Sequence, residues 1–137
     1  IYNEGLVEGI NFNFDSIMTT PNSFNSHRLL ALAYKQGVQE NVLDSLFESY
    51  FLNGEDIGDP NVLLDIAIKH KIDAEDFKSY LSDQENIEPL ANEEIQARKM
   101  GINSVPTFII NKQIVINGAQ TSENFEIIFQ KLKNSLN

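Results

Sequence analysis

The sequence contains no cysteine and few basic residues, and both absences exclude functions. Without cysteine, the 137-residue chain has no disulfide, no thiolate metal site and no thiol nucleophile of its own. Ten Lys and Arg against twenty Asp and Glu give a net charge of −10. Such a surface repels phosphate backbones and anionic lipids, so we expect neither nucleic acid nor a membrane surface as a partner.

Long apolar runs and histidine clusters are also missing. Charged or amide residues interrupt every apolar run well short of the roughly 18 residues that a membrane span needs. The two histidines are too few for a histidine-rich metal cage. The acidic loop around Gly58 does not fit an EF-hand, because Ile57 and Leu64 would stand where calcium ligands are required. We therefore expect no metal site and no bound cofactor.

Hydropathy patterning first predicts an extended segment and then a helical block. Leu6–Phe14 alternates between apolar and polar residues, which predicts a strand or extended segment within residues 1–20. Residues 21–100 repeat apolar side chains at helical spacing and predict four or five helices. Several residues have the chemistry of helix starts and ends. These are Gly37, Gly54, Asp59, Pro60, Asp73, Pro89 and Gly101.

The pattern changes after Gly101. Val105–Ile110 and Gln113–Ile116 predict two strands joined by a tight turn at Asn111, and an amphipathic helix follows them. Residues 101–137 thus have the order strand, strand, helix. The long helical block between strand-forming ends predicts an α/β fold with a large all-α insertion.

The most informative string is Gly-Ile-Asn-Ser-Val-Pro-Thr-Phe-Ile-Ile-Asn at residues 101–111. A proline in an apolar strand cannot donate to the ladder, so Pro106 should stand at an edge, a bulge or a strand start. The string resembles the thioredoxin superfamily, in which a helix ends in Gly and the chain enters a strand through Val-Pro-Thr. The resemblance implies a cis bond before Pro106, and an ordinary trans bond is the alternative.

Further strings resemble the DsbA-like branch of that superfamily, in particular its FrnE-type and 2-hydroxychromene-2-carboxylate-isomerase-like members. They are Pro-Asn-Ser-Phe-Asn-Ser-His-Arg-Leu at 21–29, Leu-Phe-Glu-Ser-Tyr-Phe at 46–51, Asp-Ile-Gly-Asp at 56–59 and Ile-Asn-Gly-Ala-Gln at 116–120. The resemblance spans essentially the whole chain in the right order. It implies a partial thioredoxin-like fold that carries a large helical insertion.

The family's reaction is thiol–disulfide exchange, in which a low-pKa thiolate attacks a disulfide sulfur. The resemblance places a Cys-x-x-Cys, or its replacement, upstream of the helical block, and this sequence begins downstream of that point. We therefore expect the chain to be the C-terminal two-thirds of a cytoplasmic, FrnE-type oxidoreductase. Its substrate would be a peptide or protein that carries a thiol or disulfide, and the chain alone would be inactive.

The resemblance also implies candidate site residues. Val105 would offer its backbone N–H and C=O to an extended substrate, Pro106 would shape the site, and Thr107 lies beside them. His27 could orient a substrate, and a packed or capping histidine is the alternative.

A second candidate site, for a carboxylate such as that of glutathione as co-substrate, lies before the last helix. Its residues are Gly118, Ala119, Gln120 and Thr121. A plain helix N-cap is the alternative.

Two other functions remain open from the sequence. One is a glutathione-dependent isomerase or transferase of the same fold, in which serine replaces the nucleophilic cysteine. The other is a non-catalytic, acidic helical interaction module. An upstream Cys-Pro-x-Cys would indicate the thiol–disulfide oxidoreductase, whereas an upstream Ser-Pro-Tyr-Ser would indicate the glutathione-dependent enzyme. Whichever function holds, we expect the edge of the predicted hairpin to be covered by an N-terminal segment or by a second copy in a homodimer.

Overall fold

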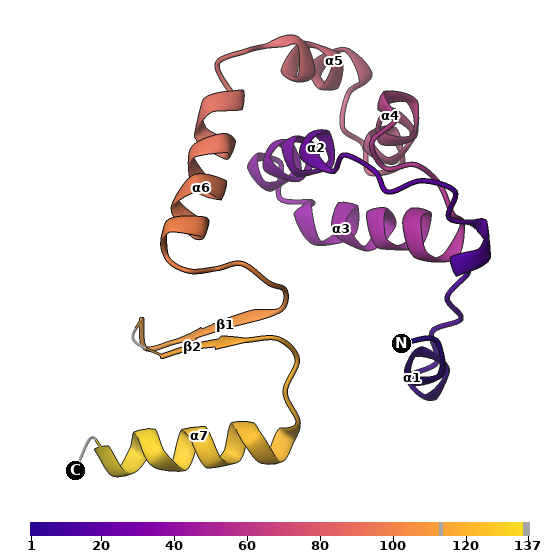
Figure 1. Cartoon of the computed structure of the whole chain (residues 1–137). Coiled ribbons are helices and arrows are strands. Elements are labelled where there is room, and N and C mark those ends of the chain that lie inside the picture. The colour runs from indigo at the N-terminus through magenta and orange to yellow at the C-terminus, as the bar shows by residue number, and fades with distance from the viewer. Residues whose placement is uncertain (113, 136–137) are drawn as a thin grey trace. The chain divides into compact units, whose positions relative to one another are not determined.

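The computed structural model describes residues 1–112 and 114–135. The chain forms two compact units, Ile1–Ala91 and Asn92–Asn137. The first unit contains α1 (Tyr2–Val7), η1 (Phe14–Ser16), α2 (Phe24–Lys35), α3 (Gln39–Phe47), η2 (Glu48–Leu52), α4 (Pro60–Lys69) and α5 (Ala74–Ser82). Helix α6 (Ile87–Lys99) crosses the boundary, and β1 (Thr107–Ile110), β2 (Ile114–Asn117) and α7 (Ser122–Ser135) complete the second unit (Figure 1).

Helices α2 to α5 pack around one hydrophobic core in the first unit. Apolar side chains at helical spacing give each of these helices a face to bury, as the sequence pattern predicts. The buried apolar residues are Leu29, Leu32, Ala33, Val42, Leu46, Leu63, Ile66, Ala67, Ile72 and Phe77. All of them come from α2 to α5 and the α4–α5 loop.

The predicted starts of α4 and α5 are confirmed. Asp59 Oδ1 accepts a hydrogen bond of 2.7 Å from the N–H of Asn61, and Pro60 takes the first helical position. Asp73 Oδ1 accepts from the first turn of α5 in the same way. Helix α6 begins at Ile87, two residues before the predicted start at Pro89. Because the first four N–H groups of a helix have no partner within it, a proline there costs no intrahelical hydrogen bond.

Of the two alternatives predicted for Leu6–Phe14, a strand or an extended segment, the strand does not form. The first residues of this segment belong to helix α1, and its last begins η1. A strand needs a neighbouring strand to pair its backbone, and no such partner is present for this segment within the described residues. Instead, the N–H of Asn13 donates to the carbonyl of Phe51, at 2.8 Å, and the Phe12 ring packs edge-on to the Phe51 ring. The alternating apolar residues therefore belong to a segment without a strand, which packs on residues of η2.

The second unit contains an antiparallel hairpin and helix α7. The register pairs Thr107 with Asn117 and Phe108 with Ile116. The first strand starts two residues later than predicted, and the predicted position of Gln113 in the second strand lies outside the described residues. The Phe108 ring lies 4.9 Å from the ring of Phe125 on α7, centroid to centroid, so the helix covers one face of the hairpin.

The other face of the hairpin is open in the described part of the chain. Ile109 and Val115 are register partners on that face and remain 42% and 44% exposed. The described strands form a two-stranded sheet, which presents both its outer edges. Among the described residues, no helix has the length and apolar content required for a membrane crossing.

Candidate functional site

The loop that leads into β1 carries the first predicted site. The Val105–Pro106 peptide bond is cis. The carbonyl of Pro106 accepts a hydrogen bond of 2.8 Å from the N–H of Gly118, and Gly118 has a φ of +82°. Such a positive φ suits glycine, because a Cβ there would meet backbone strain. The residue that follows β2 thus holds Pro106 in place.

Thr107 is fixed by two neighbours. Its hydroxyl oxygen lies 2.7 Å from the carbonyl oxygen of Ser104 and 3.0 Å from Oδ1 of Asn117. A hydroxyl carries one proton, so it donates to one of these two oxygens at a time. The Thr107 side chain therefore ties the loop to the end of β2.

Val105, unlike Thr107, is not held by hydrogen bonds in the described part of the chain. It is 91% exposed, and its backbone N–H and C=O have no hydrogen-bond partner among the residues that the structure describes. Free main-chain groups beside an anchored strand are what an extended peptide needs for β-strand addition. Val105, Pro106 and Thr107 thus combine one free backbone position with two fixed ones.

The second predicted site adjoins the first. Gly118 contacts Pro106 through the hydrogen bond above, and Gln120 Nε2 lies 3.4 Å from the carbonyl oxygen of Asn117. Ala119 is exposed between them. Thr121 Oγ1 accepts a hydrogen bond of 3.3 Å from the N–H of Asn124, which makes it the N-cap of α7.

An acidic side chain already occupies the start of α7. Hydrogen bonds from its own backbone N–H and from the hydroxyl of Thr121 lower the pKa of the fully exposed Glu123. The ionised carboxylate therefore uses the N–H groups and hydroxyls that a ligand carboxylate would need. The hydrogen bonds at this end are those of a helix cap.

His27 lies on α2 in the other unit and is exposed. Its side chain has no hydrogen-bond partner within residues 1–112 and 114–135. The packed residue at this point is its neighbour Arg28, which is 4% exposed. His27 and Arg28 lie on different faces of one helix. The sequence pattern did not show that Arg28 is the buried one of the two.

Comparisons with known proteins bear on the identity of the chain. The family model described as DSBA-like thioredoxin domain matches residues 3–130. The chain belongs to this family. No curated protein matches it.

A solved structure, the probable DsbA oxidoreductase of Streptomyces coelicolor, shares the fold of this DSBA-like chain with a TM-score of 0.78. The two sequences are 24% identical, and the match covers 95% of this chain. The chain spans 56% of the length of that structure. The predicted α/β class, a DsbA-like thioredoxin fold with a large helical content, is confirmed.

One polar pair in this DSBA-like chain was not predicted from its sequence. Ser45 Oγ on α3 lies 2.8 Å from Nε2 of His70, at the end of α4. Ser45 is 5% exposed. No local pattern joins two residues that stand 25 positions apart, so only the packing of α3 on α4 reveals the pair.

Proposed function

We propose that this chain supplies the client-binding part of a FrnE-type, DsbA-like thiol–disulfide oxidoreductase that acts in the cytoplasm. Its client is a peptide or protein that carries a thiol or a disulfide. Val105 pairs through its backbone with an extended client segment, and Pro106 and Thr107 shape the loop around it. The redox cysteines belong to a segment outside this chain.

The exposed backbone of Val105 carries this proposal. An unpaired N–H and C=O at the surface are available to a client, whereas those within a strand ladder are already used. The hydrogen bonds of Pro106 with Gly118 and of Thr107 with Asn117 hold the neighbouring residues. A fixed loop loses little conformational freedom when a client binds, which favours affinity.

For this chain, the chemistry of thiol–disulfide exchange requires that the client-binding part and the redox cysteines belong to different segments of the protein. A thiolate must attack a disulfide sulfur, and this chain contains no cysteine. Membership of the DSBA-like family and the match to 56% of a longer probable oxidoreductase support a place for those cysteines elsewhere in the protein. The hairpin's open face and edges offer a place where such a segment could dock.

The proposal is tested by comparing this chain with the same chain extended by the segment that precedes it in its gene. Reduction of a disulfide-bonded fluorogenic peptide is the assay. The extended protein should catalyse exchange and the chain alone should not. An extended protein that is folded yet inactive, or that carries no Cys-x-x-Cys, would contradict the proposed reaction.

The role of Val105 is tested in the extended protein. Val105→Pro removes the backbone N–H and should raise the KM for the peptide by about tenfold, the effect of one well-placed hydrogen bond to a bound partner. Val105→Ala keeps the N–H and serves as the matched control, with a KM close to that of the unmodified protein. Equal KM values for both variants would show that the backbone of Val105 does not bind the client.

A further inference from the structure

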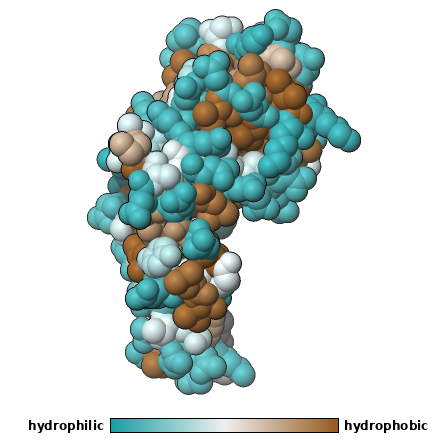
Figure 2. Space-filling model, turned by 90° about the vertical axis from the view of Figure 1, so that its right-hand side faces the viewer, coloured by the Kyte–Doolittle hydropathy of each residue, from teal (hydrophilic) through white to brown (hydrophobic). Residues whose placement is uncertain are grey.

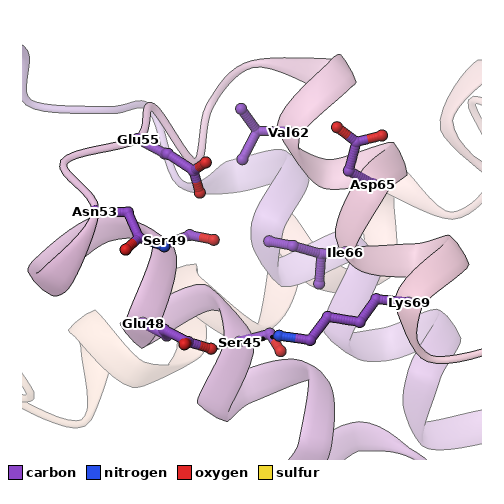
Figure 3. Close-up of a pocket in the computed structure, with 9 residues that line it drawn as sticks. All are labelled: Ser45, Glu48, Ser49, Asn53, Glu55, Val62, Asp65, Ile66 and Lys69. Atoms are coloured by element: carbon purple, nitrogen blue, oxygen red, sulfur yellow. Dashed lines mark hydrogen bonds and ion pairs between the residues drawn. The ribbon is translucent and has the colours of Figure 1, made fainter.

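A polar cavity of about 230 Å³ opens between α3, η2 and α4, within the helical unit. Figure 3 shows the side chains of Glu48, Ser49 and Glu55 on one wall and those of Asp65, Ile66 and Lys69 on the other. The Ser49 hydroxyl and the Glu55 carboxylate point into the space between the walls (Figure 3). None of these residues belongs to the site around Val105.

The π-helical turn η2 places Ser49 at this cavity. The N–H of Asn53 donates to the carbonyl of Glu48, five residues earlier, at 3.1 Å. Such a turn widens the helix by one residue and often marks a functional position.

Ser49 is a nearly buried residue of the cavity lining. Ser49 is 7% exposed, and its hydroxyl has no hydrogen-bond partner in the described part of the chain. There, no fully buried side-chain oxygen or nitrogen lacks a partner. The accessible part of the Ser49 hydroxyl must therefore face the cavity that it lines.

The charge of the cavity favours a cation. Glu48, Glu55 and Asp65 bring three carboxylates, and only Glu48 forms an ion pair within the described residues, through Lys69 Nζ at 3.3 Å. No Lys or Arg stands between Lys35 and Lys69 in the sequence. The described residues also form no group of three or more ligating side chains that could hold a metal ion. An organic cation with several N–H donors, such as an ammonium or guanidinium group, fits these acceptors better.

An apolar cleft of about 370 Å³ adjoins this cavity, because Glu48 lines both. Phe12, Phe47, Phe51 and Leu52 form its apolar lining together with Ile10. Phe47 is 54% exposed. Figure 2 shows apolar side chains at the surface among hydrophilic ones. The cleft differs because several aromatic side chains line one hollow with an acidic rim.

We propose that these two hollows bind an unfolded peptide segment, with a Lys or Arg side chain in the cavity and an aromatic or aliphatic side chain in the cleft. Charge complementarity identifies the occupant, because Glu55 and Asp65, which form no ion pair within the described residues, and the Ser49 hydroxyl are acceptors for a donor-rich cation. A peptide supplies a cation and an apolar group on one short chain, as the adjoining hollows require. If the proposed function holds, this peptide is part of the oxidoreductase's client, and in this point the inference rests on the proposed function.

Peptide binding to the chain tests the inference without any redox step. The probes are blocked Gly-Ser peptides with one Phe and one Arg, separated by one to three residues, and their binding is measured by isothermal titration calorimetry. At least one spacing should bind, and affinity should fall as salt is raised. Replacing Arg by uncharged citrulline should weaken binding by about tenfold, the effect of losing a charge-assisted hydrogen bond. Equal binding of the citrulline peptide, or binding of arginine amide as tight as that of the peptide, would overturn the inference.

Variants of the chain locate the site. Glu55→Gln should weaken binding of the Arg peptide by about tenfold, and Phe47→Ser should weaken it similarly through the cleft. The matched controls are Glu93→Gln, an exposed acid on α6, and Ile68→Ser, whose side chain is 52% exposed on α4. Controls that weaken binding as much as the site variants would overturn the inference. Because Val105→Pro should leave this binding unchanged, failure here is distinguishable from failure of the proposed function.

Discussion

The guanidinium of Arg28 and the side-chain oxygen of Asn86 are joined by two hydrogen bonds, although 58 residues separate them. Nη2 and Nε of Arg28 lie 2.7 and 3.0 Å from Asn86 Oδ1. Nη2 also lies 2.9 Å from the carbonyl oxygens of both Tyr80 and Asp83, so its two N–H groups are shared among three acceptors. A cation among the last carbonyls of a helix interacts favourably with its dipole. Arg28 thus joins α2 to the end of α5.

Loss of the Asn86 oxygen should therefore destabilise the helical unit. Asn86→Ala leaves a buried cation without one of its acceptors and should lower the free energy of unfolding by about 2 kcal/mol. Asn92→Ala, an exposed control, should change it by less than about 0.5 kcal/mol. Urea unfolding followed by circular dichroism measures both. Equal stability of the two variants would show that the Arg28–Asn86 contact contributes little.

Gly54 should be the least replaceable glycine of the helical unit. It has a φ of +71°, and a Cβ there would overlap the side chain and carbonyl of Ser16. Gly37 has a φ of +73° with open space around it, so Gly37→Ala should cost only the left-handed conformation, about 1–2 kcal/mol. Gly54→Ala should cost at least about 1 kcal/mol more. Unfolding curves compare the two, and limited proteolysis should cut the Gly54 variant faster near Ser16.

The start of α7 should respond to acid through Glu123. Because the folded pKa is lowered, Glu123 stabilises the folded state above the ordinary Glu pKa, and this stabilisation is lost as the pH falls through the folded value. Thr121→Val removes one of the hydrogen bonds that lower the pKa, so the carboxyl should then titrate at higher pH. Carbon-13 NMR of the Glu123 carboxyl measures the shift. A midpoint unmoved by Thr121→Val would contradict the assigned cause.

The second unit should depend on the contact between Phe108 and Phe125. Phe108 is half-buried, so Phe108→Ala should cost about 2 kcal/mol, less than a fully buried phenylalanine does. Ile109→Ala, on the open face, should cost less. Hydrogen exchange of the Gly118 amide, which donates to Pro106, reports on the hairpin. Faster exchange in the Ile109 variant than in the Phe108 variant would show that α7 does not support the hairpin.

Local chemistry made the helical block predictable. Asp59 and Asp73 can accept hydrogen bonds from the N–H groups that follow them, and these caps depend only on residues two or three positions away. Motifs shared with the DSBA-like family identified the fold for the same reason, since their residues are contiguous. Gly101 and Gly118, each with a positive φ, likewise stand where the sequence places turns.

Contacts between distant residues were not predictable in this way. The alternation over Leu6–Phe14 satisfies the rule for a strand, but a strand forms only where a partner strand lies beside it, and here the segment packs on Phe51. The same holds for the cavity at Ser49, which exists because α4 packs beside η2. The sequence by itself therefore determined the starts of α4 and α5, the acidic surface and the absence of a thiol, because each depends on residue type or near neighbours. Only the tertiary structure decided which backbone groups stay free at Val105 and which polar groups face a cavity, because burial and pairing depend on residues far apart in the chain.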